Sequence, residues 1–127
     1  MERVTGLGGI FFKTKDKAAT LAWYRDHLGI AFDESGVFLF EWLEKGAPDV
    51  VGQTVWAPFA ADTKYFTPGR ADFMVNYRVR DLAKMLEQLR AMGAEVDPRM
   101  EESEYGKFGW VVDPDGNRIE LWEPPPK

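Results

Sequence analysis

The chain has 127 residues, enough for one domain with a substantial core, and its composition, 45% hydrophobic and 29% charged, is typical of a soluble globular protein. Sixteen basic and 21 acidic residues give a formal charge of −5, which argues against nucleic acid and membrane surfaces as partners. The absence of cysteine excludes disulfides, thiolate metal sites and cysteine nucleophiles. With no membrane-length apolar run and no signal-peptide core, we expect a cytoplasmic protein.

The first half of the chain predicts one strand, one helix and three further strands. Alternation in GGIFFKTK predicts a strand over 8–15, and Asp16 is a candidate N-cap for a helix that ends at Gly29. Residues 30–36 and 37–43 are predicted to form two short strands around a Ser-Gly turn. A loop over 45–49 and a strand over 52–58, ended by Pro58, complete this half.

The second half predicts the same order. FMVNYRV, at 73–79, reads as a strand, and Asp81 is a candidate N-cap for a helix that stops at Gly93. Short strands follow over 94–98 and 106–112, and DPDGN has the composition of a hairpin turn into a closing strand, RIELWEP.

The two halves therefore indicate an internal duplication of a βαβββ unit. Asp16 corresponds to Asp81, Gly29 to Gly93, and Trp56 is expected to correspond to Trp122. We expect a single α+β domain over 1–127, with unit one at about 4–59, a linker at about 60–70 and unit two at about 71–124.

This pattern resembles the vicinal-oxygen-chelate superfamily, which contains glyoxalase I, bleomycin-resistance proteins and extradiol dioxygenases. AWYRDHLGI and DPDGNRIELWEP carry the resemblance most specifically, and it extends over nearly the whole chain. The resemblance implies curled mixed sheets that meet edge to edge and enclose a U-shaped trough, with the helices on the convex side. It also implies a ligand in the trough and association into a homodimer.

Strand alternation assigns side chains to the two faces of the predicted sheet. The aliphatic set is expected to face the helices: Ile10, Phe12, Val75, Val79, Ile119 and Leu121. Gly9 and Arg118 are expected to face the trough, together with the candidate ligand-binding residues: Phe11, Lys13, Met74, Asn76, Arg78, Phe108, Trp110, Glu120 and Trp122.

Metal-dependent members of the superfamily hold a divalent ion with about four side chains from the first and last strands of each unit. The final glutamate matches Glu120, but the first-strand positions fall on Gly9 and Met74, and the remaining one falls near Thr54 or Val55. Glycine offers no ligand atom, and a thioether is a poor ligand for a hard ion. The lone histidine, His27, is expected at the end of a helix away from the trough, so we expect no metal and no cofactor.

Glu120 has three interpretations from the sequence. It could be a structural partner of Arg78, Lys13 or Arg118, an anion that binds the ligand, or a general base whose pKa is raised by aromatic neighbours. Tyr105, in the predicted loop 101–108, could cap a ligand.

The functional hypothesis is a metal-independent protein that binds a small, partly aromatic molecule. The alternatives are a metal-dependent lyase, isomerase or dioxygenase of the same superfamily, a metal-free enzyme that uses Glu120 as its base, and a non-catalytic structural or regulatory dimer module. Positive charge in the trough argues against a strongly cationic ligand.

Overall fold

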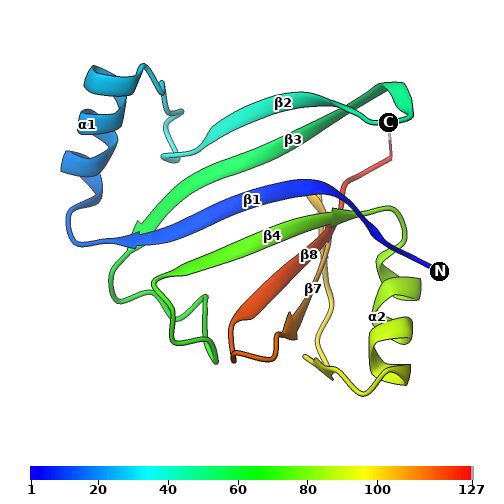
Figure 1. The fold of residues 1–127 in the computed structure, drawn as a ribbon. Coiled ribbons are helices and arrows are strands. Elements are labelled where there is room, and N and C mark those ends of the chain that lie inside the picture. The colour runs from blue at the N-terminus through cyan, green and yellow to red at the C-terminus, as the bar shows by residue number, and fades with distance from the viewer. Residues whose placement is uncertain (127) are drawn as a thin grey trace.

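The computed structural model describes residues 1–126, apart from the side chain of Pro48. Its elements form one open, mixed eight-stranded sheet and two helices (Figure 1). Their bounds are β1 Val4–Thr14, α1 Lys17–Leu28, β2 Phe38–Glu44, β3 Ala47–Ala60, β4 Phe73–Val79, α2 Leu82–Ala91, β5 Glu95–Val96, β6 Glu101–Ser103, β7 Gly106–Val112 and β8 Arg118–Glu123. The sheet order is β2-β3-β1-β4-β8-β7-β5, and β6 pairs with β7.

The strand register shows how the two halves are related. β1 and β4 pair antiparallel at the centre of the sheet, where Ile10 lies opposite Val75. Each of these strands also pairs in parallel with the last strand of its own half, β1 with β3 and β4 with β8. The two halves thus meet edge to edge in one chain, and the α+β class expected from the sequence is confirmed.

The helices begin and end where the sequence predicts. Asp16 and Asp81 accept hydrogen bonds from Ala19 N and Lys84 N at 3.0 Å, which caps the first turn of each helix. Gly29 ends α1 with φ 73°, and Gly93 adopts φ 83° immediately after the C-cap of α2. Both helices are too short to cross a membrane.

The two helices cover the sheet unequally and lie at opposite ends of it (Figure 1). Leu82, Met85 and Leu86 of α2 are buried against β4, β7 and β8 and form the main core. α1 buries none of its residues completely and contacts the sheet chiefly through the ring of Tyr24, which lies 4.6 Å from that of Trp56. This end of the sheet is therefore held mainly by aromatic contacts.

The predicted strand over 30–36 is wrong. Asp33 Oδ1 accepts hydrogen bonds from the backbone N–H groups of Ser35 and Val37, and Gly36 N donates to the Asp33 carbonyl. A turn therefore takes the backbone groups that a strand would pair. Unit one contributes three strands to the sheet.

The predicted bounds of the strand over 52–58 are also wrong. The observed strand, β3, begins at Ala47 within the expected loop at 45–49 and continues through Pro58 to Ala60. Trp56 is the last residue of β3 paired with β2, whereas Phe12 of β1 still lies opposite Pro58. Beyond Trp56, β3 has no neighbour on its β2 side, so a residue without an N–H is tolerated there.

The predicted loop 101–108 contains the short strand β6 and its hairpin with β7. The segment between β3 and β4 covers residues 61–72, so it ends two residues later than the predicted linker at about 60–70. It does not pass over the surface as a simple connection, because Phe66 is only 2% exposed.

Candidate functional site

The predicted assignment of faces agrees with the packing. Val79, Ile119 and Leu121 contact α2, and Phe12 lies 4.7 Å from Trp56 on the face covered by α1. The opposite face, which we call the trough face, carries one row of neighbours across the sheet. In that row, Glu120 pairs in register with Asn76 on one side and with Trp110 on the other.

Glu120 is enclosed by neutral hydrogen-bond donors. Its side chain is 2% exposed and accepts hydrogen bonds from Asn76 Nδ2 at 2.7 Å, from Trp110 Nε1 at 3.0 Å and from the hydroxyl of Tyr65. Two donors come from β4 and β7, the strands that pair with β8 on either side, and the third comes from the segment 61–72. The carboxylate is thus held in one position but is shielded from solvent by Tyr65.

Burial shifts the pKa values of Glu120, Tyr65 and Arg118. Burial raises the pKa of Glu120, although its hydrogen bonds and the charge of Arg118 partly oppose the shift. Burial, followed by the neighbouring charge of Glu120, raises the pKa of the Tyr65 hydroxyl, which therefore stays protonated and donates. Burial also lowers the pKa of Arg118. The direction for Glu120 is the one expected if aromatic neighbours desolvate it.

The cations proposed as partners of Glu120 lie elsewhere. Arg78 Nη1 donates to Glu44 Oε2 at 3.0 Å, and Lys13 Nζ lies 5.8 Å from the centre of the Phe66 ring. Arg118 lies 4.6 Å above the Trp110 ring and 3.7 Å from a carboxylate oxygen of Asp97. Within residues 1–126, no ion pair includes Glu120, so the sequence-based interpretation of Glu120 as half of an ion pair is wrong.

Segment 61–72 supplies two residues that the sequence analysis did not assign to the site. Phe66 packs against Phe11, Ala57 and Met74, which together form a small cluster on the trough face. Tyr65, which is 36% exposed, stacks on Phe59 with ring centres 5.7 Å apart. The available signal was a pair of aromatic residues within an otherwise polar connection.

The open part of the trough is a groove of about 1000 Å³ at the other end of the sheet. Its walls include Gln53 of β3, Arg78 of β4 and Trp122 of β8. Asp49 and Val51 of β3 also line the groove, as do Pro124, Pro125 and Pro126 of the C-terminal segment. The predicted site residues thus separate into an inner group around Glu120 and an outer group along the groove.

Among the described residues that line the groove, Trp122 is the one aromatic side chain, and it is 8% exposed. Phe108 and Trp122 are in register on β7 and β8, and their rings are nearly parallel, at 6° and with centres 6.2 Å apart. Trp122 Nε1 donates to the Tyr105 carbonyl at 2.8 Å, which fixes the orientation of the indole. A planar ligand in the groove could contact the edge or face of this indole.

The register also places the four positions at which related proteins carry metal ligands. The match of the N-caps Asp16 and Asp81 makes Gly9 correspond to Met74 and Phe11 to Asn76. The register agrees with a twofold relation of the halves, since Gly9 lies opposite Asn76 and Phe11 opposite Met74. Since Phe11 pairs with Ala57 and Asn76 with Glu120, Ala57 is the counterpart of Glu120. The expected positions at Thr54 or Val55 are therefore wrong, as is the expected match of Trp56 with Trp122.

These positions do not fit a divalent metal. Gly9 and Ala57 have no ligand atom, and Met74 is 1% exposed within the apolar cluster. A Cβ at Gly9 would lie 2.9 Å from Phe11 Cζ, so a side chain could not be added there without movement of the neighbouring ring. Among residues 1–126, no group of three His, Cys, Asp or Glu side chains is placed to hold a metal ion.

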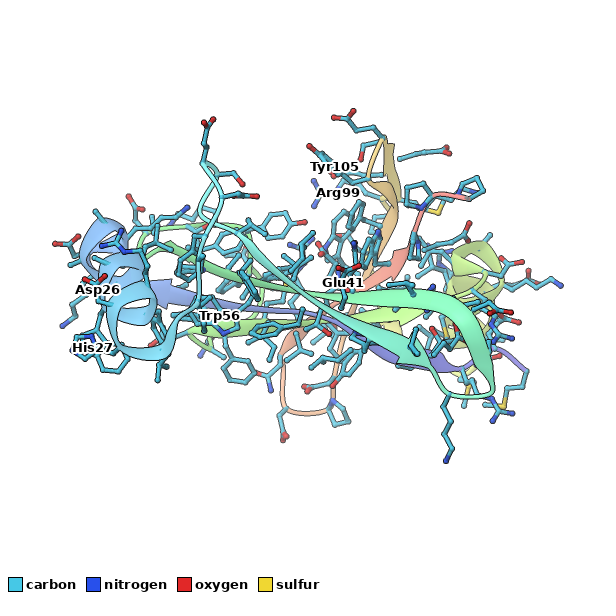
Figure 2. The ribbon with its side chains drawn as sticks, turned by 90° about the horizontal axis from the view of Figure 1, so that it is seen from above. Asp26, His27, Glu41, Trp56, Arg99 and Tyr105 are labelled. Carbon is cyan, nitrogen blue, oxygen red and sulfur yellow. The ribbon has the colours of Figure 1, made fainter. Side chains whose placement is uncertain are left out.

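His27 and Tyr105, two further residues that the sequence analysis considered for the site, lie away from the inner group. Figure 2 shows His27 on α1 at one end of the molecule, well away from Tyr105. The His27 ring stacks on that of Trp23 at 4.5 Å, and both side chains are exposed, in agreement with a helix-end position outside the trough. Tyr105 is 68% exposed and its side chain covers no part of the described site, whereas its carbonyl holds Trp122.

An open sheet built from two related halves, with a glutamate on the last strand facing the trough, defines an α+β protein of the vicinal-oxygen-chelate type. The family model described as a glyoxalase-like domain matches residues 9–122, and the chain belongs to this family. A comparison with curated proteins returns no match.

Solved structures with the same fold include methylmalonyl-CoA epimerase from Mycobacterium tuberculosis, with 22% identity, a TM-score of 0.64, and coverage of 97% of this chain and 90% of the epimerase. The Streptomyces coelicolor epimerase, as a variant in complex with 2-nitronate-propionyl-CoA, gives 16% identity, a TM-score of 0.68, and coverage of 98% and 100%. A glyoxalase/bleomycin resistance protein/dioxygenase superfamily member from Vibrio splendidus 12B01 gives 14% identity, a TM-score of 0.57, and coverage of 97% and 99%. At these identities the likeness concerns the fold.

Proposed function

We propose that the chain is a metal-independent, ligand-binding member of the glyoxalase-like family, and that it takes a small, partly aromatic molecule in the groove. The observation that carries this proposal is the groove of about 1000 Å³ beside Trp122, in a trough whose inner positions lack a metal-binding set. Pockets that combine aromatic side chains with a few fixed polar groups are typical of small-molecule sites.

The charges of the groove favour a neutral or cationic ligand over an anionic one. Arg78 is already paired with Glu44, and Lys107 Nζ lies 3.7 Å from Glu123. Glu41 and Glu102 also line the groove and are exposed. Negative charge therefore exceeds positive charge here, which differs from the expectation, based on Lys13, Arg78 and Arg118, that a cationic ligand is unfavourable. This reasoning argues against CoA esters such as the ligand of the Streptomyces coelicolor epimerase variant.

The test is a calorimetric titration with three bicyclic probes that differ in charge: 2-naphthol, 2-naphthylmethylamine and 2-naphthoate. We expect the neutral and cationic probes to bind about tenfold more tightly than the anion, since like charges across a binding surface are unfavourable. Trp122→Leu should weaken the first two about fivefold to tenfold, because an aromatic contact is lost. Trp23→Leu, at an exposed indole on α1, is the matched control. Equal binding of all three probes, or an equal loss in both variants, would contradict the proposal.

A metal-dependent lyase, isomerase or dioxygenase is the alternative, and it makes an opposite prediction about stability. Tight binding to the folded state raises the melting temperature by mass action. With Glu120 alone among the four expected ligand positions, we expect Mn²⁺, Ni²⁺ and Zn²⁺ to leave the melting temperature unchanged in differential scanning calorimetry. An increase of several degrees that is lost in Glu120→Gln would favour the metal-dependent alternative.

Homodimer formation and a cytoplasmic location stay predictions. The unpaired outer edge of β2, with Leu39 and Leu43 exposed by 43% and 64%, supports the first, since an apolar edge strand favours pairing with another chain. A structural or regulatory module with a closed trough is the remaining alternative, and the buried position of Phe66 is the observation that supports it.

A further inference from the structure

Phe66 is buried on the trough face, and the residue before it, Tyr65, is hydrogen-bonded to Glu120. The Phe66 ring is 2% exposed, although both sequence neighbours, Tyr65 and Thr67, are exposed. It belongs to one buried cluster with Phe11 of β1, Ala57 of β3 and Met74 of β4, which lie on the trough face of three adjacent strands of the sheet. A connecting segment thus fills, with one aromatic ring, a hollow whose floor and sides belong to the sheet.

Tyr65 occupies the adjacent position above Glu120. Its hydroxyl donates to Glu120 Oε2, the oxygen that also accepts from Trp110. Met74 beneath Phe66 and Asn76 beside Glu120 are two residues apart on β4, a separation of roughly 6.5–7 Å along a strand. An aromatic ring with one attached hydroxyl or amino group has about this length, so a single small molecule could replace both side chains.

Segment 61–72 has few backbone hydrogen bonds to the sheet. Its backbone hydrogen bonds at Thr63, Thr67 and Gly69 join residues within the segment or to Ala60 at its start. Its contacts with the sheet include the Tyr65 and Phe66 side chains, the hydrogen bond from Arg118 to the Tyr65 carbonyl, and the close approach of Gly69 to the Arg118 backbone. At the end of the segment, Lys13 N of β1 donates to the Asp72 carbonyl at 2.7 Å, which anchors the segment where β4 begins. Between residues 61 and 71, no backbone hydrogen bond of the described chain pairs this segment with a strand.

We propose that segment 61–72 is an intramolecular occupant of the inner trough, and that its displacement opens a binding site for a small aromatic molecule with a hydroxyl or amino hydrogen-bond donor. The ring takes the place of Phe66 between Phe11 and Met74, and the donor takes the place of the Tyr65 hydroxyl on Glu120. This site is distinct from the groove. The proposal therefore extends the proposed function, and if it is wrong the proposed binding in the groove is unaffected.

Phe66→Ala tests the proposal with two probes, 4-methylphenol and toluene. Large-to-small substitutions leave apolar cavities that accept small aromatic molecules, and removal of a competing internal occupant strengthens apparent affinity. We expect calorimetry to show 4-methylphenol binding to the variant about tenfold more tightly than to the unaltered protein, and about fivefold more tightly than toluene. Phe73→Ala, at a 48% exposed ring on β4, is the matched control and should bind as the unaltered protein does.

Indole N–H resonances in the nitrogen-15 spectrum locate the probe. We expect 4-methylphenol to shift the resonance of Trp110, which donates to Glu120, and to leave that of Trp122 in place. Equal affinity for the two probes, or no gain over the unaltered protein, would overturn the proposal. A shift confined to Trp122 would also overturn it while placing the probe in the groove, in keeping with the proposed function. If Phe66→Ala does not fold, Phe66→Val provides the same comparison with a smaller cavity.

Discussion

Replacement of Glu44 by glutamine is expected to lower the free energy of unfolding by about 1–3 kcal/mol, because it leaves a largely buried cation without its counter-charge. Glu44 is 6% exposed and accepts from Arg78 Nη1 at 3.0 Å and from Arg80 Nη2. The Arg78 side chain is 13% exposed and lies 5.6 Å from the centre of the Trp42 ring, so it cannot turn freely to solvent. Urea unfolding of both proteins measures the loss.

The pH dependence of this loss has a definite sign. Hydrogen bonds from Arg80 and Arg78 lower the pKa of Glu44 from its ordinary value of 4.5. A carboxyl whose pKa is lower in the folded state stabilises the fold above the ordinary value, and this contribution disappears as the pH falls through the folded-state pKa. The difference between Glu44→Gln and the unaltered protein should therefore be full at pH 7 and shrink below pH 4. Glu41→Gln, at an exposed carboxylate on the same strand, should show almost no loss. Equal losses in the free energy of unfolding for Glu41→Gln and Glu44→Gln would contradict the role of Glu44 as the counter-charge of Arg78.

Local signals were sufficient to predict the framework of the fold. Asp16 and Asp81 form N-caps from side chains that act within three residues, and Gly29 ends α1 through its own backbone conformation. The faces of β1, β4 and β8 follow from alternation with period two, which fixes every second side chain once one is placed. These features depend on short-range geometry, and for that reason they can be read from the sequence.

The features that the sequence did not reveal depend on contacts between distant residues. The distribution of cations is the clearest case, because the sequence suggested Glu120 as a partner of Arg78, whereas the fold pairs Arg78 with Glu44 of β2. Tyr65 reaches Glu120 across 55 positions of sequence, from a segment that carries no periodic pattern. The register of β3 against β1 could likewise not be fixed by alternation, since slips by two residues preserve the face.

Replacement of Glu120 by glutamine is expected to raise the free energy of unfolding at neutral pH by about 0.5–2 kcal/mol, since buried charge at a binding site commonly reduces stability. The carboxylate is 2% exposed and has no ion-pair partner among residues 1–126, so the folded state bears the cost of desolvating its charge. Glutamine keeps the shape, and its carbonyl can accept from Tyr65 and Trp110 as Oε2 does now.

The amide group of the variant also finds a partner. Asn76 Oδ1 is buried and without a hydrogen-bond partner, while Asn76 Nδ2 donates to Glu120 Oε1. Rotation of the Asn76 amide by half a turn would direct Oδ1 to the new NH₂ group, so the hydrogen bond between positions 76 and 120 is kept with its direction reversed. Removal of the charge therefore leaves the Trp110 and Tyr65 donors with an acceptor. At Glu44, by contrast, the same substitution leaves the charged Arg78 without a counter-charge.

The gain in stability of Glu120→Gln should depend on pH because the pKa of Glu120 is raised, whereas that of Glu44 is lowered. Burial raises the pKa of Glu120 above its ordinary value of 4.5, so the unaltered protein loses stability relative to the variant as the pH rises from that value through the folded-state pKa. The two proteins should unfold alike at about pH 4 and differ more at about pH 8. Urea unfolding at both pH values tests this expectation. A loss of stability in Glu120→Gln at pH 8 would mean that the charge itself holds the inner trough together, with Arg118 as its partner, and would assign Glu120 to the scaffold and not to a ligand site.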